Sequence, residues 1–83
     1  GKFEGALASL QQAKAILEEN YGIVDKRTTK VKRNISLCLL KLSRIPEALA
    51  EMKEVEERNA EIEKRAKEDA ALAIQQERKR RAE

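Results

Sequence analysis

The sequence predicts an all-α fold in which a helical repeat is followed by a long charged helix. Alanine, leucine, glutamate, lysine and arginine dominate the 83 residues, and 40% of the chain is charged. Such a mixture is typical of long helices or helical repeats. Apolar residues recur with helical period up to about residue 55, and no Gly or Pro interrupts residues 47–83.

The composition also limits the classes of function. The chain has no His, one Cys and three Gly, so few groups are available for catalysis, metal binding or cradling a phosphate. We therefore expect a protein that is not an enzyme and needs no cofactor or metal. The lone Cys38 is interpreted as a small apolar core residue in a reducing compartment. The first 20 residues hold no uninterrupted apolar run, so we expect neither a signal peptide nor a membrane span.

Residues 3–20 have the pattern of an amphipathic helix. Their apolar stripe consists of Ala6, Leu10, Ala13 and Leu17, and is widened by Leu7 and Ile16. Gly22 follows, and Gly ends helices because it accepts a positive φ without penalty. We expect residues 23–27 to form a short connection.

A second helix is predicted over about residues 29–42, capped by Thr28 or Thr29, because a hydroxyl accepts a hydrogen bond from the first helical turn. Its apolar stripe consists of Val31, Ile35, Cys38, Leu39 and Leu42, with Leu37 and Leu40 beside it. Since this helix is apolar on more than one face, we expect it to be buried between neighbours on both sides.

A third helix is predicted from about residue 46, with Pro46 in its first turn, where a missing N–H costs little. Its expected buried side consists of Ala48, Leu49, Met52 and Val55. Beyond residue 57 large aliphatic residues become rare, and 14 of the last 26 residues are charged. Pairs with the acid first and the base four residues later favour a helix, namely Glu61–Arg65, Glu63–Lys67 and Glu77–Arg81. The third helix should therefore continue as a long solvated helix.

Two stretches of the chain share a pattern at a spacing of 42 residues. One begins at Gly1 and the other at Ser43. Each contains a small residue, a base, a large apolar residue, two spacers, Ala-Leu-Ala and, after one more residue, an apolar residue. A fixed period of this size is typical of stacked helical solenoids.

This pattern resembles the tetratricopeptide repeat (TPR). The residues that carry the resemblance are Gly1, Phe3, Ala6, Leu7, Leu10 and Ala13 in one repeat, and Asn34, Ile35, Leu39, Ser43, Ile45, Ala48, Leu49, Met52 and Val55 in the next. The spacing of 42 residues, rather than the family's usual 34, looks like the longer repeats of the kinesin light chain group. Ser43 and Val55 depart from the family pattern, which has a turn Gly and a small Ala at these positions.

The resemblance implies antiparallel helix-turn-helix repeats of a TPR-like solenoid. Residues 1–22 would be the second helix of a truncated repeat, residues 23–57 a full repeat, and residues 58–83 a charged helical extension. The residues expected to pack the repeats together are Phe3, Ala6, Leu7, Leu10, Ile35, Leu39, Ile45, Ala48, Leu49 and Met52. Since such arrays need neighbours, flanking repeats of the same chain are expected partners.

The resemblance also places a peptide-binding groove on the second predicted helix. The candidate groove residues are Lys30, Arg33, Asn34, Leu37 and Lys41. An amide at Asn34 could hold a peptide backbone because it both donates and accepts hydrogen bonds, and Lys30 with Arg33 would favour an acidic or C-terminal carboxylate ligand. The alternative interpretation is that the two bases are solvated and that Asn34 bonds to a neighbouring helix.

Two functions remain open on the sequence. One is a non-catalytic scaffold that binds peptide segments or partner subunits; the other is a structural strut whose charged helix lies along a filament or a larger complex. The kinesin light chain resemblance alone places either in an intracellular, cytoplasmic or cytoskeletal setting such as a motor or a cilium. The basic run of residues 78–81 is interpreted as a charged helix end rather than a nuclear-localisation or nucleic-acid tag, so no nucleic-acid partner is expected.

Overall fold

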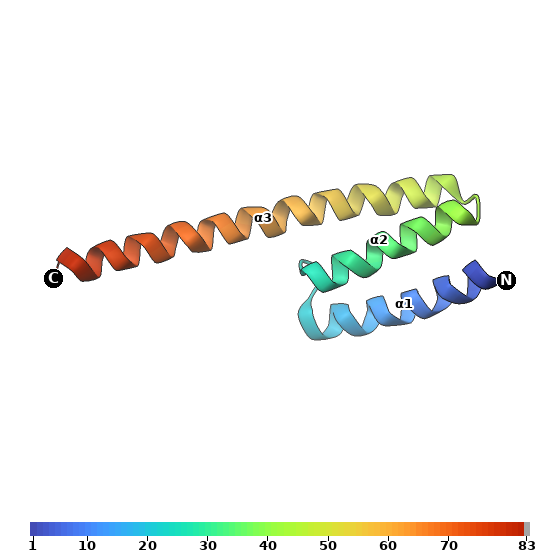
Figure 1. Ribbon diagram of the computed structural model, residues 1–83, viewed down its shortest axis with the longest axis horizontal. Helices are drawn as coiled ribbons and strands as arrows, with labels where there is room; N and C mark the ends of the chain where they lie inside the picture. The colour runs from blue at the N-terminus through green and yellow to red at the C-terminus, as the bar shows by residue number, and fades with distance from the viewer. Residues whose placement is uncertain (83) are drawn as a thin grey trace.

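The computed structural model describes residues 1–82, which form three α-helices: α1 (Lys2–Tyr21), α2 (Lys26–Lys41) and α3 (Ile45–Ala82). Successive helices are antiparallel and lie side by side in one layer, with α2 in the middle and α3 extending far beyond the other two (Figure 1). The Cα trace extends over 64 × 22 × 14 Å, so the three helices form an elongated, thin arrangement. The predicted all-α class is confirmed, and both faces of the layer are open.

The small core lies on α2, where it meets its two neighbours. Ile35, Leu39 and Ala48 are buried in it, and Leu7 and Leu10 of α1 pack against them. Because α2 packs against a helix on either side, it needs apolar residues on more than one of its faces, as the sequence pattern indicates. The core holds few large side chains, so only a small number of apolar contacts stabilise the packing of the three helices.

The connection between α1 and α2 differs from the predicted one. Gly22 adopts the expected positive φ of 83°, but α2 begins at Lys26, earlier than predicted, because the carboxylate of Asp25 caps it by accepting a hydrogen bond from the Arg27 N–H at 2.8 Å. The prediction of a threonine cap is therefore wrong. Thr28 and Thr29 are instead buried within the first turn.

The two threonine hydroxyls tie the turn together from inside the helix. Thr28 Oγ1 donates to the Gly22 carbonyl at 2.9 Å, and Thr29 Oγ1 donates to the Asp25 carbonyl at 2.8 Å. Across the same turn, the Arg27 guanidinium lies 3.9 Å from the centre of the Tyr21 ring, a distance at which a cation is attracted to an aromatic face. The end of α1 is thus fixed to the start of α2.

The turn between α2 and α3 is a Schellman motif, in which two backbone N–H groups bond back across the helix end. The Ser43 N–H donates to the Leu40 carbonyl at 3.0 Å, and the Arg44 N–H donates to the Leu39 carbonyl at 2.9 Å. Ser43 takes a φ of 59°, a conformation that favours glycine. Ser43, one of the two positions at which the chain departs from the TPR pattern, therefore has the backbone geometry that suits a glycine.

The long third helix is confirmed, and it divides into a packed half and a free half. It runs without a break from Ile45 to Ala82. Val55 and Ala48 are buried on its packed half, whereas every side chain from residue 63 to residue 81 is exposed. The three predicted ion pairs are present, with N–O distances of 3.1 Å for Glu61–Arg65, 3.5 Å for Glu63–Lys67 and 3.2 Å for Glu77–Arg81. We call residues 63–82 the α3 extension.

Candidate peptide-binding groove

The α2 helix presents three bases and a leucine on one side. Lys26, Lys30, Arg33 and Leu37 follow one another at steps of three or four residues, which places them on one face of a helix. This face borders α3 and forms one wall of a shallow groove between the two helices. We call it the α2/α3 groove.

The α2/α3 groove has two connected ends. The end near the start of α2 is lined by Lys26, Thr29, Lys30, Arg33, Val55 and Asn59. The other end is lined by Arg33, Ser36, Leu37, Met52, Val55 and Glu56. Arg33 and Val55 belong to both ends, so the two hollows adjoin. The first end carries three bases, whereas the second combines the apolar Leu37, Met52 and Val55 with Arg33, Ser36 and the acid Glu56.

The chemistry of the groove suits a ligand with both charge and apolar surface. Val55 is buried at its floor, and half of the Leu37 side chain is open to solvent. Among the described residues, no carboxylate lies within ion-pair distance of Lys30 or Arg33, although both side chains are exposed. Two unpaired cations beside an exposed leucine can bind a carboxylate and an apolar side chain together.

The structure brings together three of the five candidate groove residues. Lys30, Arg33 and Leu37 line the α2/α3 groove. Asn34 and Lys41 are exposed on α2 but do not line it. Asn59 of α3 lines the groove, so the groove contains an amide, although not the one predicted at Asn34.

The residues expected to pack the repeats range from buried to exposed. Ile35, Leu39 and Ala48 are buried, and Leu7, Leu10 and Met52 are half-buried. Phe3, Ala6, Ile45 and Leu49 are exposed. The expected burial of Leu49 on the packed side of α3 is wrong, because the layer is one helix thick and this leucine lies on a face that no other helix of the described chain covers.

Sequence reasoning missed a buried lysine behind the groove. Lys32 is only 3% exposed and occupies the α2 core stripe between Thr28 and Ile35. Its ammonium lies 2.6 Å from Glu51 Oε2 and 2.7 Å from Glu54 Oε2, both on α3. The available signal was a lysine on the same helical stripe as Ile35 and Leu39, opposite a predicted helix with glutamates three residues apart.

This ion pair extends into a network that joins the three helices. Arg58 Nη2 lies 3.5 Å from Glu54 Oε2, and Arg58 Nη1 lies 3.8 Å from Glu18 Oε1 of α1. Burial of the Lys32 ammonium lowers its pKa, but the hydrogen bonds and charges of Glu51 and Glu54 outweigh burial and raise that pKa above its ordinary value. The hydrogen bond from Lys32 is the main cause that lowers the pKa of Glu54. Both groups are therefore held in their charged forms.

The rest of the described chain offers little other chemistry. Within residues 1–82, no group of three His, Cys, Asp or Glu side chains is arranged to hold a metal ion, and Cys38 is a half-buried free thiol. None of the described helices combines the length and the apolar character needed to cross a membrane.

Comparison with known proteins gives no relative for this chain: no protein-family model, no curated protein and no solved structure matches it. The function is therefore inferred from the residues of the groove.

Proposed function

We propose that the chain is a non-catalytic protein–protein interaction module, a TPR-like helical repeat that binds acidic or C-terminal peptide segments in the α2/α3 groove. The main support for this proposal is that Lys30, Arg33 and the exposed Leu37 all line one groove. A peptide carboxylate would pair with the two cations, and an apolar side chain of the peptide would contact Leu37 and Met52.

The open layer supports the same proposal. Phe3, Ile45 and Leu49 leave 40%, 45% and 58% of their surface exposed, on a layer that is one helix thick. In a TPR-like solenoid, flanking repeats stack on such surfaces and extend the groove from one repeat to the next. We accordingly propose partner subunits and further repeats as its neighbours, in an intracellular setting that is cytoplasmic, cytoskeletal or ciliary by the kinesin light chain resemblance.

The proposal is tested by reversing the charge of the groove. Fluorescence anisotropy would measure the binding of a labelled peptide that ends in a leucine and two glutamates. The double variant Lys30→Glu and Arg33→Glu should weaken binding by about tenfold or more, because each lost charge-assisted bond is replaced by repulsion.

A matched control separates the groove from general charge. The double variant Lys2→Glu and Lys53→Glu changes the net charge equally, and neither residue lines the groove. Its binding should remain within about threefold of the natural chain, since exposed charges at a distance are screened by salt. Equal losses in both variants would show that the peptide is held by net charge alone and would remove the groove proposal.

The second candidate function is the structural strut, and the free half of α3 favours it. All side chains from residue 63 to residue 81 are exposed, and helix geometry gives such a stretch a length of about 27 Å. A helix this long without any covering element in the described chain is able to lie along a filament or a larger complex.

A further inference from the structure

The α3 extension carries a continuous seam with an unusual order of charge. From residue 64 onward, alternating steps of three and four residues connect six exposed side chains. In order along the helix these are two bases, two apolar residues and two bases. The seam consists of Lys64, Lys67, Ala71, Ile74, Arg78 and Arg81. We call this set the basic seam.

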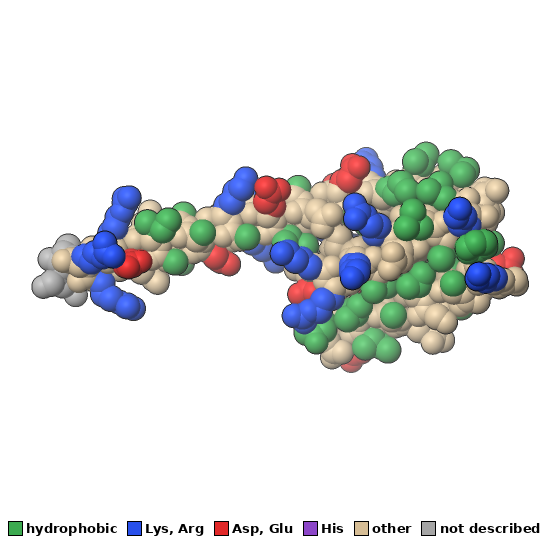
Figure 2. All heavy atoms as spheres, in the orientation of Figure 1, with side chains coloured by type: hydrophobic (Ala, Val, Ile, Leu, Met, Phe, Trp, Pro, Cys, Tyr) green, Lys and Arg blue, Asp and Glu red, His purple; other side chains and the backbone are tan. Residues whose placement is uncertain are grey.

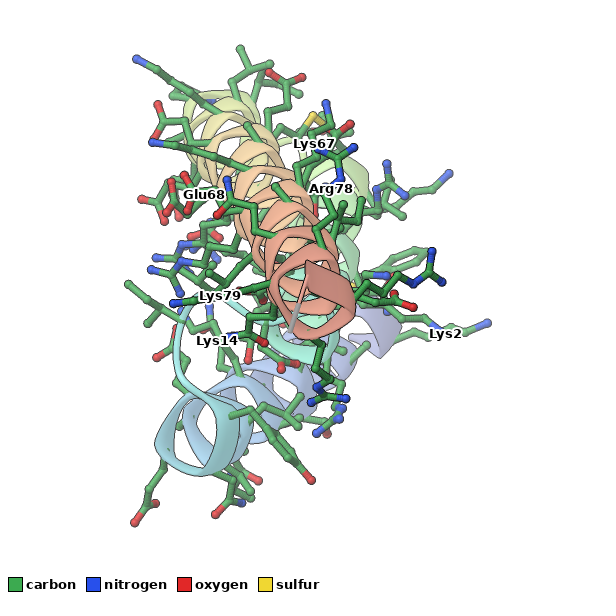
Figure 3. The ribbon with its side chains drawn as sticks, turned by 90° about the vertical axis from the view of Figure 1, so that its left-hand side faces the viewer. Lys2, Lys14, Lys67, Glu68, Arg78 and Lys79 are labelled. Carbon is green, nitrogen blue, oxygen red and sulfur yellow. The ribbon has the colours of Figure 1, made fainter. Side chains whose placement is uncertain are left out.

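Helix geometry places the basic seam on one side of α3. At 3.6 residues per turn its members fall within a sector of about 100°, and they span about 25 Å along the axis. Viewed along α3, Lys67 and Arg78 project toward one side of the helix, whereas Glu68 and Lys79 project toward another (Figure 3). The remaining bases of the extension, Arg65, Lys79 and Arg80, lie on the other sides.

Charge along α3 changes sign where the packing ends. Residues 54–63 hold five acids and one base, whereas residues 64–81 hold seven bases and three acids. Figure 2 shows this difference of surface, with hydrophobic side chains gathered over the three-helix end and well-separated charged side chains along the extension. The positive region therefore coincides with the part of the helix whose described side chains are all exposed, and its start borders the connection between α1 and α2.

The bases of the seam are available to a partner. Lys67 pairs with Glu63 and Arg81 with Glu77, but all four side chains are at least 65% exposed, and such pairs contribute little. Among the described side chains, no carboxylate lies within ion-pair distance of Lys64 or Arg78. Ile74, at the centre of the seam, is 54% exposed.

We infer that the basic seam is a docking surface for an acidic helix of a partner protein, with carboxylates at both ends of the contact and apolar side chains at its centre. Steps of three and four residues are the pattern with which one helix packs along another. Charged ends around an apolar centre match the rim and core of a protein interface. This inference deepens the second proposed function, the strut, and rests on it.

The same features disfavour the other partners. Two copies of the seam would place bases against bases at both ends, in either orientation, and like charges repel. A phosphate backbone makes no use of an isoleucine and an alanine at the centre of the contact. A membrane surface requires a much wider apolar face than these two residues provide.

The test uses the full chain and a designed probe. The probe is an alanine-based helical peptide whose own seam has glutamates at both ends and leucines in the middle; a duplex DNA and vesicles of phosphatidylserine serve as comparison probes. The triple variant Lys64→Glu, Lys67→Glu and Arg78→Glu should weaken binding of the peptide by about tenfold or more. The matched triple variant Arg65→Glu, Lys79→Glu and Arg80→Glu has the same net charge and should weaken it by less than about threefold.

Hydrogen exchange of the full chain with the peptide bound distinguishes a failure of the seam inference from a failure of the strut proposal. Protection within residues 63–82, lost only in the first triple variant, supports the seam. Protection confined to the α2/α3 groove contradicts the strut itself. Protection in the extension with equal losses in both triple variants leaves the strut standing and overturns the seam. Tighter binding of the DNA or of the vesicles than of the peptide at physiological salt also overturns it, as does the absence of measurable peptide binding.

Discussion

The two halves of α3 belong to one unbroken helix but are stabilised in different ways. The first half, from Ile45 to Ile62, packs on α2 and buries Ala48 and Val55. The α3 extension has no packed face and depends on helix propensity and on ion pairs between residues four apart. The comparison teaches that the same secondary structure can rest on tertiary burial at one end and on local interactions at the other.

The largest expected effect would come from removing the core that holds the packed half. Ile35 is fully buried between the helices, so Ile35→Ala should cost about 2–5 kcal/mol, because it removes apolar contacts and leaves a cavity. Urea unfolding followed by circular dichroism would measure the loss. The control is Leu72→Ala in the extension, where Leu72 is 54% exposed, and it should change the free energy of unfolding by about 0.5 kcal/mol or less. Similar losses in the two variants would contradict the division of α3 into two halves.

A second expected effect concerns the two kinds of ion pair. Lys32→Met removes the partner of Glu51 and Glu54 on the packed half and should destabilise the fold by about 1–3 kcal/mol, because the buried Glu51 oxygen loses its cation. Lys67→Met removes an exposed pair of the extension and should cost at most about 0.5 kcal/mol. Thermal melts of both variants would check the difference, and a Lys32→Met variant as stable as the natural chain would show that the buried pair contributes nothing.

The same buried pair predicts a pH window for stability. The pKa of Glu54 is lowered below its ordinary 4.5, so its contribution is present above that value and is lost as the pH falls through the lower, folded-state pKa. The pKa of Lys32 is raised above 10.5, so its contribution is present below that value and is lost as the pH rises through the higher, folded-state pKa. Melting temperatures measured across pH should therefore fall at both extremes, and Lys32→Met should flatten both slopes.

The smallest expected effect is a gain in stability at the turn that leads into the packed half. Ser43 has a φ of 59°, which strains an L-residue but not glycine. Ser43→Gly should therefore stabilise the fold by about 0.5–1 kcal/mol without changing any side-chain contact of the core. Chemical denaturation would measure the gain. A loss of stability would mean that the serine side chain has a role in the turn that outweighs its backbone strain.

Much of the fold could be predicted from periodicity, and the errors have physical causes. The third helix and its unpacked end followed from the absence of breakers and from acid-first pairs. The start of α2 was misplaced because Asp25 and the two threonines are all good caps, and only the path of the chain decides among them. Leu49 was expected to be buried because it belongs to the apolar stripe of its helix. Such a stripe shows which residues can be buried, but it does not show whether another helix packs over them.

The candidate groove was predicted in part, for a similar reason. Lys30, Arg33 and Leu37 share a helical face that can be read from their spacing. Lys41 continues the same face four residues beyond Leu37, but it lies past the residues that line the groove. Asn34 does not line the groove either, because the position and extent of a groove depend on the neighbouring helix, which the spacing of one helix does not encode. Lys32 was missed because a buried lysine is expected only when its carboxylate partners are known, and those partners come from another helix.

The contact between Arg27 and Tyr21 has an optical consequence. The chain contains no tryptophan and a single tyrosine, so its near-ultraviolet absorption and its intrinsic fluorescence come almost entirely from one ring, held against a guanidinium at 3.9 Å. The tyrosine therefore reports on one place, the connection between α1 and α2, while far-ultraviolet dichroism averages over all three helices. If α1 detaches before the rest of the layer unfolds, the tyrosine signal will change at a lower temperature than the helix signal, and the two curves will separate.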